Sequence, residues 1–373
     1  MERIILFPMF IHSSKGGMQQ IVLDLILGLN KSGWDCRLIG YKDSELTASF
    51  KEKGIKTYEI QTPCNKVQWI RFIFSYYKAI FTYRKALIVT NDIFSHILLS
   101  LYPLSKKEIF VSHGGDYKSK GEKFAAKSGR SAKIARYSFK RVTQFVAVSD
   151  TQREALINNA HVNPSKVVTI YNGYDSSKVR KAKKKANPHV INISVVGFIK
   201  PLKNQQVLLD TIKELRSLNY NCILNLYGSI SDQKYYDQLI CDIKKLKIEN
   251  AVVFHGYISD KDAIYNNTDI LISCSNHEGF GLSLIEAMAY QVPTIGYAKS
   301  AGPSSIIEDY KTGILVKENT SKAYKEAVLQ YLTDTDFKNI VVKNSIIRFE
   351  EKFSLNTMIE RYDNLFHLIY DRS

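Results

Sequence analysis

The segment from Glu278 to Glu286, EGFGLSLIE, combines groups that suit two kinds of ligand. Gly279 and Gly281 let the backbone approach an anion where the pattern predicts that a helix begins. The N–H groups of a helix start bind phosphate, whereas carboxylates only accept hydrogen bonds and suit pairs of hydroxyls. A ligand with phosphate in its middle and hydroxyls at both ends, such as a nucleotide sugar, fits both observations.

Each glutamate also has a plainer interpretation. The helix dipole favours an acid such as Glu278 at a helix start, and Glu286 would be an exposed helix position. A dinucleotide-binding fingerprint fails here, because Leu284 stands where the third glycine is needed.

The elements around this segment predict an α/β fold. Residues 269–275 and 293–297 read as strands on either side of a helix over about 281–290, and ligands bind beyond the carboxyl ends of such strands. Short apolar runs alternate with helical patterns along the whole chain, which favours parallel sheets with helices on both faces. We expect two doubly wound, Rossmann-like domains, because 373 residues exceed the size of one usual core.

The predicted domain boundaries follow a change in composition. We expect a first domain at 1–178, a basic linker at 179–187 and a second domain at 188–355. The last segment, 356–373, is predicted to be an amphipathic helix whose apolar face holds Met358, Tyr362, Leu365, Phe366 and Ile369.

Charge is distributed unevenly between the two halves. Residues 1–186 hold 32 Lys and Arg against 14 Asp and Glu, and residues 187–373 hold 20 against 22. Nucleic acid, anionic lipid or an anionic substrate would each explain a basic half. The five cysteines are scattered without metal spacing, which is typical of reduced thiols in a cytoplasm. No signal peptide is indicated, and Asn91, Asp92 and His96 interrupt the longest apolar stretch, which favours a buried strand and helix over a membrane span.

The chain resembles the retaining GT-B glycosyltransferases of family 4 along almost its full length. Glu278 and Glu286 form that family's E-x7-E pattern. Six further pieces occur in the family's order: KGGMQQIVLDLILGL, VSHGGDY, VAVSDTQ, VTIYNGYD, VVGFIKPLKNQQVLL and GPSSIIEDYKTGILV. The resemblance implies two Rossmann-like domains facing a cleft, with the nucleotide sugar on the second, the acceptor on the first, and the last helix crossing back to the first.

The resemblance also implies roles for the residues of the opening segment. Glu286 would hold the ribose hydroxyls and Glu278 those of the donor sugar. The backbone of Phe280, Gly281 and Leu282 would lie near the sugar and the diphosphate. Retention would proceed by front-face attack, in which the leaving phosphate helps to deprotonate the acceptor.

A basic loop would bind the diphosphate. Gly197 ends a strand, and Lys203 stands where the family keeps a lysine on the diphosphate, whose charge grows as it departs. The family usually has an arginine after that glycine, but this chain has Phe198. Lys200 is either a replacement for that charge, without the fork of a guanidinium, or a solvated loop lysine.

Residues of the first half complete the predicted site. Gly16 and Gly17 match the family's glycine-rich loop, His113 matches a histidine near the donor sugar, and Asn172 with Gly173 lies on the hinge side. The plainer interpretations are a flexible loop, a structural strand-end histidine and a plain Asn-Gly turn. We expect His113 to position the sugar rather than to act as a base.

We expect neither a metal nor a cofactor besides the donor substrate. Asp334 and Asp336 form a literal D-x-D, the metal motif of other glycosyltransferases, but they stand between two helices, where aspartates serve as caps. The predicted enzyme is therefore a metal-independent hexosyl- or N-acetylhexosaminyltransferase.

The acceptor is predicted from the basic half. Residues 66–85 interleave aromatic and cationic side chains, and 118–141 add a second basic segment. Such mixing suits an anionic membrane surface. We expect a cytoplasmic enzyme, peripheral at the inner face of the membrane, that acts on a lipid-linked or surface-glycan precursor in bacterial polysaccharide or lipopolysaccharide assembly. The alternative is that the aromatics are core and the lysines solvated.

Two rival functions remain at this stage. A GT-B epimerase or phosphorylase would bind related ligands. A nucleic-acid-binding protein would explain the pI of about 9.4, although it leaves the E-x7-E segment unexplained, and we expect no nucleic acid among the partners.

Overall fold

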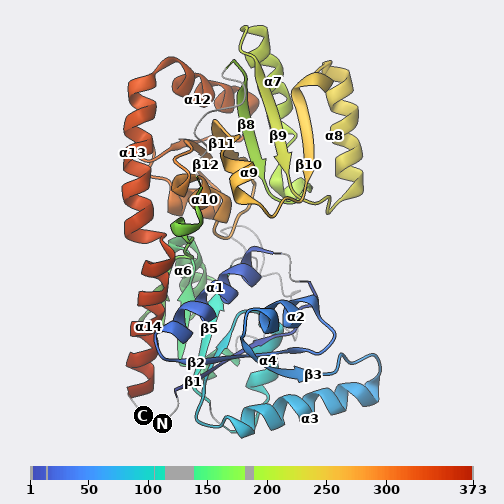
Figure 1. Ribbon diagram of the computed structural model, residues 1–373, viewed down its shortest axis with the longest axis vertical. Coiled ribbons are helices and arrows are strands. Elements are labelled where there is room, and N and C mark those ends of the chain that lie inside the picture. The colour runs from blue at the N-terminus through green and yellow to red at the C-terminus, as the bar shows by residue number, and fades with distance from the viewer. Residues whose placement is uncertain (1–2, 14–15, 105, 114–137, 181–188, 372–373) are drawn as a thin grey trace. The chain divides into compact units, whose positions relative to one another are not determined.

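The computed structural model describes residues 3–13, 16–104, 106–113, 138–180 and 189–371 (Figure 1). The chain divides into two compact units, of which unit 1 comprises Met1–Gly173 with Leu355–Ser373 and unit 2 comprises Tyr174–Ser354. The division falls slightly before the predicted boundary, because the Tyr174 N–H donates to the Phe353 carbonyl and Tyr174 forms a bridge with Ser354. Most of the predicted linker, 179–187, lies outside the described residues.

Unit 1 is built on a parallel sheet of seven described strands in the order β3-β2-β1-β4-β5-β6-β7. The order reverses between β1 and β4, and the loops at the carboxyl ends of such strands form the binding edge of the sheet. The strands are β1 (Ile4–Met9), β2 (Asp35–Tyr41), β3 (Lys56–Ile60), β4 (Leu87–Thr90), β5 (Glu108–Ser112), β6 (Gln144–Ala147) and β7 (Val167–Thr169).

Helices connect these strands, as parallel pairing requires. They are α1 (Gly17–Lys31), α2 (Glu45–Glu52), α3 (Lys66–Thr82), α4 (Ile93–Ser100), α6 (Asp150–Asn158) and α14 (Leu355–Asp371), with short 3₁₀ turns η1 (Phe139–Arg141) and η2 (Pro164–Lys166). α3 and α4 share one core cluster with side chains of β1, β2 and β4. The apolar run that had favoured a strand and a helix over a membrane span is β4 followed by α4.

The last helix packs on unit 1, as predicted. α14 buries Met358, Tyr362, Leu365, Phe366 and Ile369, which are the five residues of the predicted apolar face. It packs closely on α1 at Gly28, where an added Cβ atom would stand only 2.1 Å from Ile359 Cδ1. Trp34 donates its indole N–H to Asp363 at 2.6 Å, which ties the middle of α14 to unit 1.

Unit 2 is built on a second parallel sheet, in the order β10-β9-β8-β11-β12-β13. Its strand order reverses between β8 and β11, so the loops after these two strands meet at one edge. The strands are β8 (Ile191–Val196), β9 (Cys222–Tyr227), β10 (Val252–Gly256), β11 (Ile270–Ser273), β12 (Thr294–Tyr297) and β13 (Ile314–Val316).

The helices of unit 2 are mostly amphipathic, and one apolar cluster joins several of them to the strands. They are α7 (Val207–Ser217), α8 (Gln233–Leu246), α9 (Lys261–Tyr265), α10 (Leu282–Ala289), α11 (Ala301–Ile306), α12 (Ser321–Thr333) and α13 (Thr335–Lys352), with 3₁₀ turns η3 (Ser176–Lys178), η4 (Pro201–Lys203) and η5 (Glu249–Ala251). Two Rossmann-like α/β units are therefore present, as the sequence predicts. None of the helices in the described ranges is long and apolar enough to cross a membrane.

Candidate functional site

The loop between β11 and α10 holds Glu278 in an ion pair. Its Oε2 atom contacts the Lys203 ammonium and accepts a hydrogen bond from the Ser275 hydroxyl at 3.1 Å. The Glu278 and Lys203 side chains are 21% and 15% exposed, so the pair is sheltered but still reaches solvent. The structure thus brings together two residues that lie 75 positions apart in the sequence.

Two further contacts fix the Lys203 loop against the Glu278 loop. The Asn276 N–H donates to the Leu202 carbonyl at 3.0 Å, and the Cys274 thiol donates to the Lys203 carbonyl at 3.2 Å. Gly197 follows β8, as expected, and a Cβ atom there would lie 3.2 Å from Lys203 Cε. Glycine at this position therefore leaves room for the lysine side chain.

Glycines also shape the start of α10. Gly281 caps the helix in the left-handed conformation, with φ of 98°, which a residue with a Cβ adopts at a strain cost. The Gly302 N–H donates to the Glu278 carbonyl at 2.9 Å, and a Cβ atom at Gly302 would stand 2.1 Å from the Phe280 carbonyl oxygen. The structure thus places Phe280, Gly281 and Leu282 at the N-terminus of α10, in one loop with Glu278.

Glu286 lies one turn into α10 and is buried, being 7% exposed. Its Oε2 atom accepts hydrogen bonds from the Lys261 ammonium at 2.9 Å and from the Tyr265 hydroxyl at 2.5 Å. The plainer interpretation of Glu286 as an exposed helix position is therefore wrong. Lys261 and Tyr265 were missed by the sequence reasoning, and their only signal is their spacing of one helical turn in a short helix.

Each of the two carboxylates is bound through only one of its oxygen atoms. In both Glu278 and Glu286 the side-chain partners bind Oε2, and Oε1 has no partner among the described residues. Each glutamate also has its own lysine, so the two negative charges are compensated locally. The two pairs compensate the negative charges around the start of α10, while each glutamate still offers one acceptor oxygen.

Tyrosine side chains lie around Glu286. Burial raises the pKa of Tyr174 to about 12, and the neighbouring Glu286 charge acts in the same direction. Burial and the Glu286 carboxylate also hold the pKa of Tyr265 well above its usual range. Tyr290 donates its hydroxyl to Asp262 at 2.6 Å, and its ring lies 5.1 Å from that of Tyr265. These phenols therefore remain neutral hydrogen-bond donors at neutral pH.

Phe198 stands where the resembling family usually has an arginine, and Lys200 follows two residues later. The Phe198 ring is 45% exposed, and the Lys200 ammonium lies 5.6 Å from its centroid, which is a cation–π contact. Lys200 also caps η4, the turn that ends at Lys203. The aromatic ring therefore holds a cation close to the Lys203 loop, without the fork of a guanidinium.

In unit 1, His113 follows β5 and contacts the end of β4. Its Nε2 atom lies 2.9 Å from Asn91 Oδ1, and with this oxygen as acceptor Nε2 carries the proton. Burial lowers the pKa of His113 to about 4, so the imidazole is neutral at neutral pH. A neutral, hydrogen-bonded ring suits the predicted positioning role.

The other predicted residues of unit 1 lie at loop ends. Gly16 caps α1 and Gly17 begins it. A Cβ atom at Gly16 would meet only the flexible end of Gln19, so space alone does not require glycine there. Asn172 is buried, and its Oδ1 atom has no hydrogen-bond partner within the described residues. Neither Asn172 nor Gly173 has a positive φ, so a tight type I′ Asn-Gly turn is ruled out.

Two other arrangements resemble catalytic sites without being accessible or complete. Asp334 of the D-x-D accepts a hydrogen bond from the Phe337 N–H and caps α13, as predicted. His96 contacts Glu108 at 2.8 Å and Ser138 at 2.7 Å, an acid–histidine–serine order, but all three side chains are buried, which makes this a structural network. No cluster of three potential metal ligands occurs in the ranges that the structure describes.

Comparison with protein families identifies both halves of the chain. A family model described as glycosyl transferases group 1 matches residues 176–348, and one described as glycosyltransferase family 4 matches residues 15–178. The two matches overlap at residues 176–178 and together span most of the chain.

Individual relatives and solved structures share only 17–24% sequence identity with this chain in the following three examples. A capsular polysaccharide biosynthesis glycosyltransferase of Staphylococcus aureus is 24% identical over 62% of this chain, and the match spans 63% of that relative, less than two thirds of its length. A UDP-Gal:alpha-D-GlcNAc-diphosphoundecaprenol alpha-1,3-galactosyltransferase of Escherichia coli is 21% identical over 94% of this chain and 93% of its own. The crystal structure of HepE of Anabaena in complex with UDP superposes with a TM-score of 0.83, at 17% identity, over 98% of this chain and all of that one.

Proposed function

The chain belongs to the family 4, group 1 glycosyltransferases, and on that premise we propose that it moves a sugar from a nucleoside-diphosphate sugar to an acceptor hydroxyl with retention of configuration. The observation that carries this proposal is the pair of lysine-held glutamates on either side of the α10 N-terminus. Unit 2 is proposed to bind the donor and unit 1 the acceptor.

The contacts support the following proposed roles in donor binding. Lys203 moves from Glu278 to the diphosphate when the donor binds, because phosphate carries the greater negative charge. Glu278 then accepts hydrogen bonds from the hydroxyls of the donor sugar, and Glu286 accepts those of the ribose through Oε1. Gly197 and the backbone of Phe280, Gly281 and Leu282 provide close approach to the phosphates.

The chemical step needs a stabilised leaving group. As the bond from the anomeric carbon to the phosphate oxygen breaks, Lys203 and the N-terminus of α10 stabilise the charge that develops on the diphosphate. The acceptor oxygen bonds to the same face of the anomeric carbon and gives its proton to the departing phosphate oxygen. These protein charges take the part that a metal ion has in other transferases, and we propose metal-independent transfer without a cofactor.

The remaining predicted residues have supporting roles in this proposal. Lys200, held over the Phe198 ring, adds positive charge near the diphosphate. His113 positions the donor sugar as a neutral hydrogen-bond acceptor through Nδ1, because its Nε2–H is donated to Asn91. Gly16 and Gly17 form a backbone loop for the diphosphate and acceptor. Asn172 Oδ1, which has no hydrogen-bond partner among the described residues, accepts a hydrogen bond from a ligand hydroxyl.

The substrates are proposed from the relatives' names and from the charge distribution. The Escherichia coli relative uses a UDP sugar and a diphosphoundecaprenol acceptor, and the Staphylococcus aureus relative serves capsule synthesis. We therefore propose transfer of a hexose or N-acetylhexosamine to a lipid-linked or surface-glycan precursor of bacterial polysaccharide or lipopolysaccharide. The enzyme would act in the cytoplasm, at the inner face of the membrane.

A donor screen tests the function directly. The full-length protein is incubated with UDP-, GDP- and ADP-sugars, and both free nucleotide and the sugar's configuration are followed. We expect slow release of the nucleoside diphosphate from one donor, with the sugar otherwise unchanged. Isomerisation of the intact donor would indicate an epimerase, and turnover that requires inorganic phosphate a phosphorylase. Failure to bind or cleave any donor would contradict the proposal.

A further inference from the structure

α3 in unit 1 carries apolar side chains on two opposite faces. One face, with Phe72, Tyr76, Ala79 and Ile80, is buried against the sheet. The other face is exposed and holds Val67, Ile70, Phe74 and Phe81, which are 60%, 56%, 71% and 55% exposed. A surface helix normally has one apolar face, so the second face requires an explanation.

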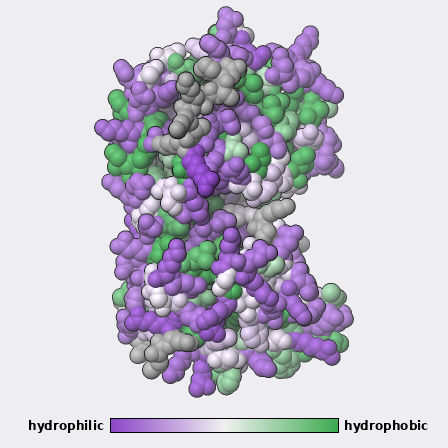
Figure 2. Space-filling view, viewed as in Figure 1, coloured by the Kyte–Doolittle hydropathy of each residue, from purple (hydrophilic) through white to green (hydrophobic). Residues whose placement is uncertain are grey.

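The four exposed residues form one continuous line, which we call the outer stripe. Their spacings of three, four and seven residues return to the same side of an α-helix. The outer stripe therefore runs along most of α3, on the side away from the core. In Figure 2, green hydrophobic residues appear among purple ones over the part of unit 1 where Figure 1 places this helix.

The charges on the segment that carries the outer stripe are all of one sign. Residues 60–91 contain five Lys and Arg and neither Asp nor Glu. Arg71 and Lys78, one heptad apart, lie along one flank of the stripe, and Lys66 lies one turn before Ile70 on the other. An apolar helix face between cations is typical of helices that lie in the interface of an anionic bilayer.

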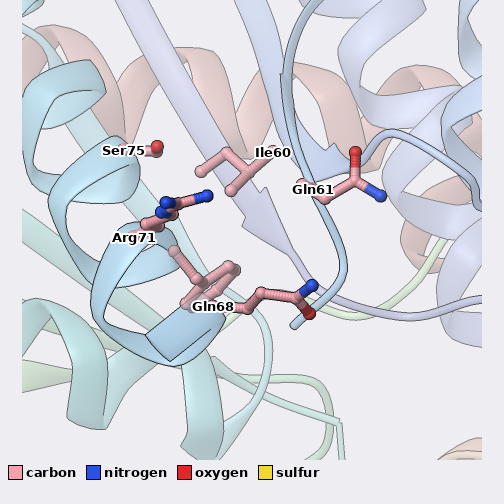
Figure 3. Close-up of a pocket in the computed structure, with 6 residues that line it drawn as sticks. Ile60, Gln61, Gln68, Arg71 and Ser75 are labelled. Atoms are coloured by element: carbon pink, nitrogen blue, oxygen red, sulfur yellow. The ribbon is translucent and has the colours of Figure 1, made fainter. Parts of the chain in front are cut away.

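A small pocket opens beside the outer stripe, at the carboxyl end of β3. It has a volume of about 160 Å³ and is lined by Ile60, Gln61, Gln68, Arg71, Phe72 and Ser75. Figure 3 shows Arg71, Gln68 and Ser75 on the helix and Ile60 and Gln61 on the strand end that faces it. Arg71 has no ion-pair partner among the described residues, and its guanidinium is the group best suited to a phosphate oxygen.

We propose that α3 docks the protein on an anionic lipid bilayer, with the outer stripe in the interfacial layer and a lipid phosphate at Arg71. A second copy of this chain is a poorer occupant. A twofold interface through α3 would place the cations of the two copies against each other, with no acid on the segment to compensate them. The exposed phenylalanines likewise favour lipid over the hydrated backbone of a nucleic acid.

This inference deepens the proposed function, because it rests on a lipid-linked acceptor and names the surface that brings the enzyme to it. The geometry of α3 places the binding edge of unit 1 close to the bilayer, since the pocket lies at the carboxyl end of β3. Vesicle binding is measured without turnover, so it is separable from the transferase activity.

The test is flotation of the full chain with vesicles of phosphatidylcholine alone or mixed with phosphatidylglycerol, at low and high salt. The double variant Ile70→Ser with Phe74→Ser removes the centre of the outer stripe, and Arg71→Gln removes the pocket cation. The matched control, Ile340→Ser with Ile347→Ser, changes two exposed apolar residues of α13 in unit 2.

We expect the wild type and the α13 control to float with phosphatidylglycerol vesicles at low salt and much less at high salt. Binding of the stripe variant should fall by at least about tenfold, and that of Arg71→Gln by about fivefold. Donor hydrolysis in solution should be unchanged in the stripe variant, because its side chains face solvent.

Three results would overturn the inference. The first is a wild type that does not bind anionic vesicles at low salt, and the second is a stripe variant that binds as the wild type does. The third is a wild type that sediments as a dimer through this face, and becomes a monomer in the stripe variant, without binding vesicles. Vesicle binding without any donor hydrolysis would instead contradict the transferase proposal and leave the docking surface intact.

Discussion

At the scale of single residues, the site depends on how charges are paired. Lys203 and Lys261 each hold one glutamate through one carboxylate oxygen, beside the predicted diphosphate site. In the proposed mechanism, Lys203 exchanges between the Glu278 carboxylate and the diphosphate, which couples donor binding to the release of Glu278. Lys203 would then act both in the resting site and in the transition state.

Replacing Lys203 tests this coupling. We expect Lys203→Met to lower kcat for donor turnover by about 10²- to 10³-fold, because a group that stabilises the leaving charge is lost. Lys200→Met, which removes a cation from the same loop but not from the ion pair, should have a clearly smaller effect. Steady-state kinetics measure both, and equal effects of the two variants would contradict the role given to Lys203.

The sequence predicts these residues only in part. Lys203, Glu278 and Glu286 stand out through their motifs, whereas Lys261 and Tyr265 do not, because α9 is too short to show a period and its contact with α10 is tertiary. The sequence also shows that Phe198 replaces an arginine. It does not show that Lys200 lies over that ring, since the position depends on the loop conformation.

At the scale of elements, the loop that holds Glu278 is set by close backbone contact with α11. α11 begins against the carbonyl of Phe280, and only a residue without a Cβ permits that approach. The strand-turn-helix order was predictable from hydrophobic pattern and glycine positions. The contact with α11 was not, because nothing in the sequence pairs Gly302 with Phe280.

A substitution at Gly302 separates packing from chemistry. Gly302→Ala should displace the Glu278 loop, destabilise unit 2 by about 1–3 kcal/mol and lower donor affinity. Ser304→Ala, at an exposed position of the same helix, should have little effect on either quantity. Denaturant unfolding and nucleotide titration measure the two effects, and a Gly302→Ala protein with wild-type stability and affinity would argue against this packing.

At the scale of the whole molecule, the chain leaves unit 1 after residue 173 and returns to it at residue 355. The predicted face of the last helix was confirmed because its five apolar residues keep a strict helical period over one long helix. The packing of this helix on α1, where Gly28 contacts Ile359, could not be predicted from the sequence. Helix periodicity shows which face is apolar but not which element covers it.

Because α14 belongs to unit 1, a substitution in its buried face should destabilise unit 1 and not unit 2. Phe366→Ala removes a fully buried ring and should destabilise unit 1 by about 3–5 kcal/mol. Leu368→Ala, at an exposed position of the same helix, should be nearly neutral. Hydrogen exchange by mass spectrometry should show lost protection in α1 and the unit 1 strands, with unit 2 unchanged; equal loss in both units would contradict the division.

The most direct test of the whole account asks whether Glu286 binds the ribose and Glu278 binds the donor sugar. Titration calorimetry compares the binding of two ligands to Glu278→Gln and Glu286→Gln, after thermal melts confirm that both variants are folded. The ligands are the nucleotide sugar that the donor screen identifies and its nucleoside diphosphate. We predict that Glu286→Gln weakens both ligands by about 10- to 100-fold, because both contain the ribose. Glu278→Gln should weaken the nucleotide sugar but not the nucleoside diphosphate. Wild-type affinity of Glu286→Gln for the nucleoside diphosphate, or equal losses of both ligands in Glu278→Gln, would contradict the assignment.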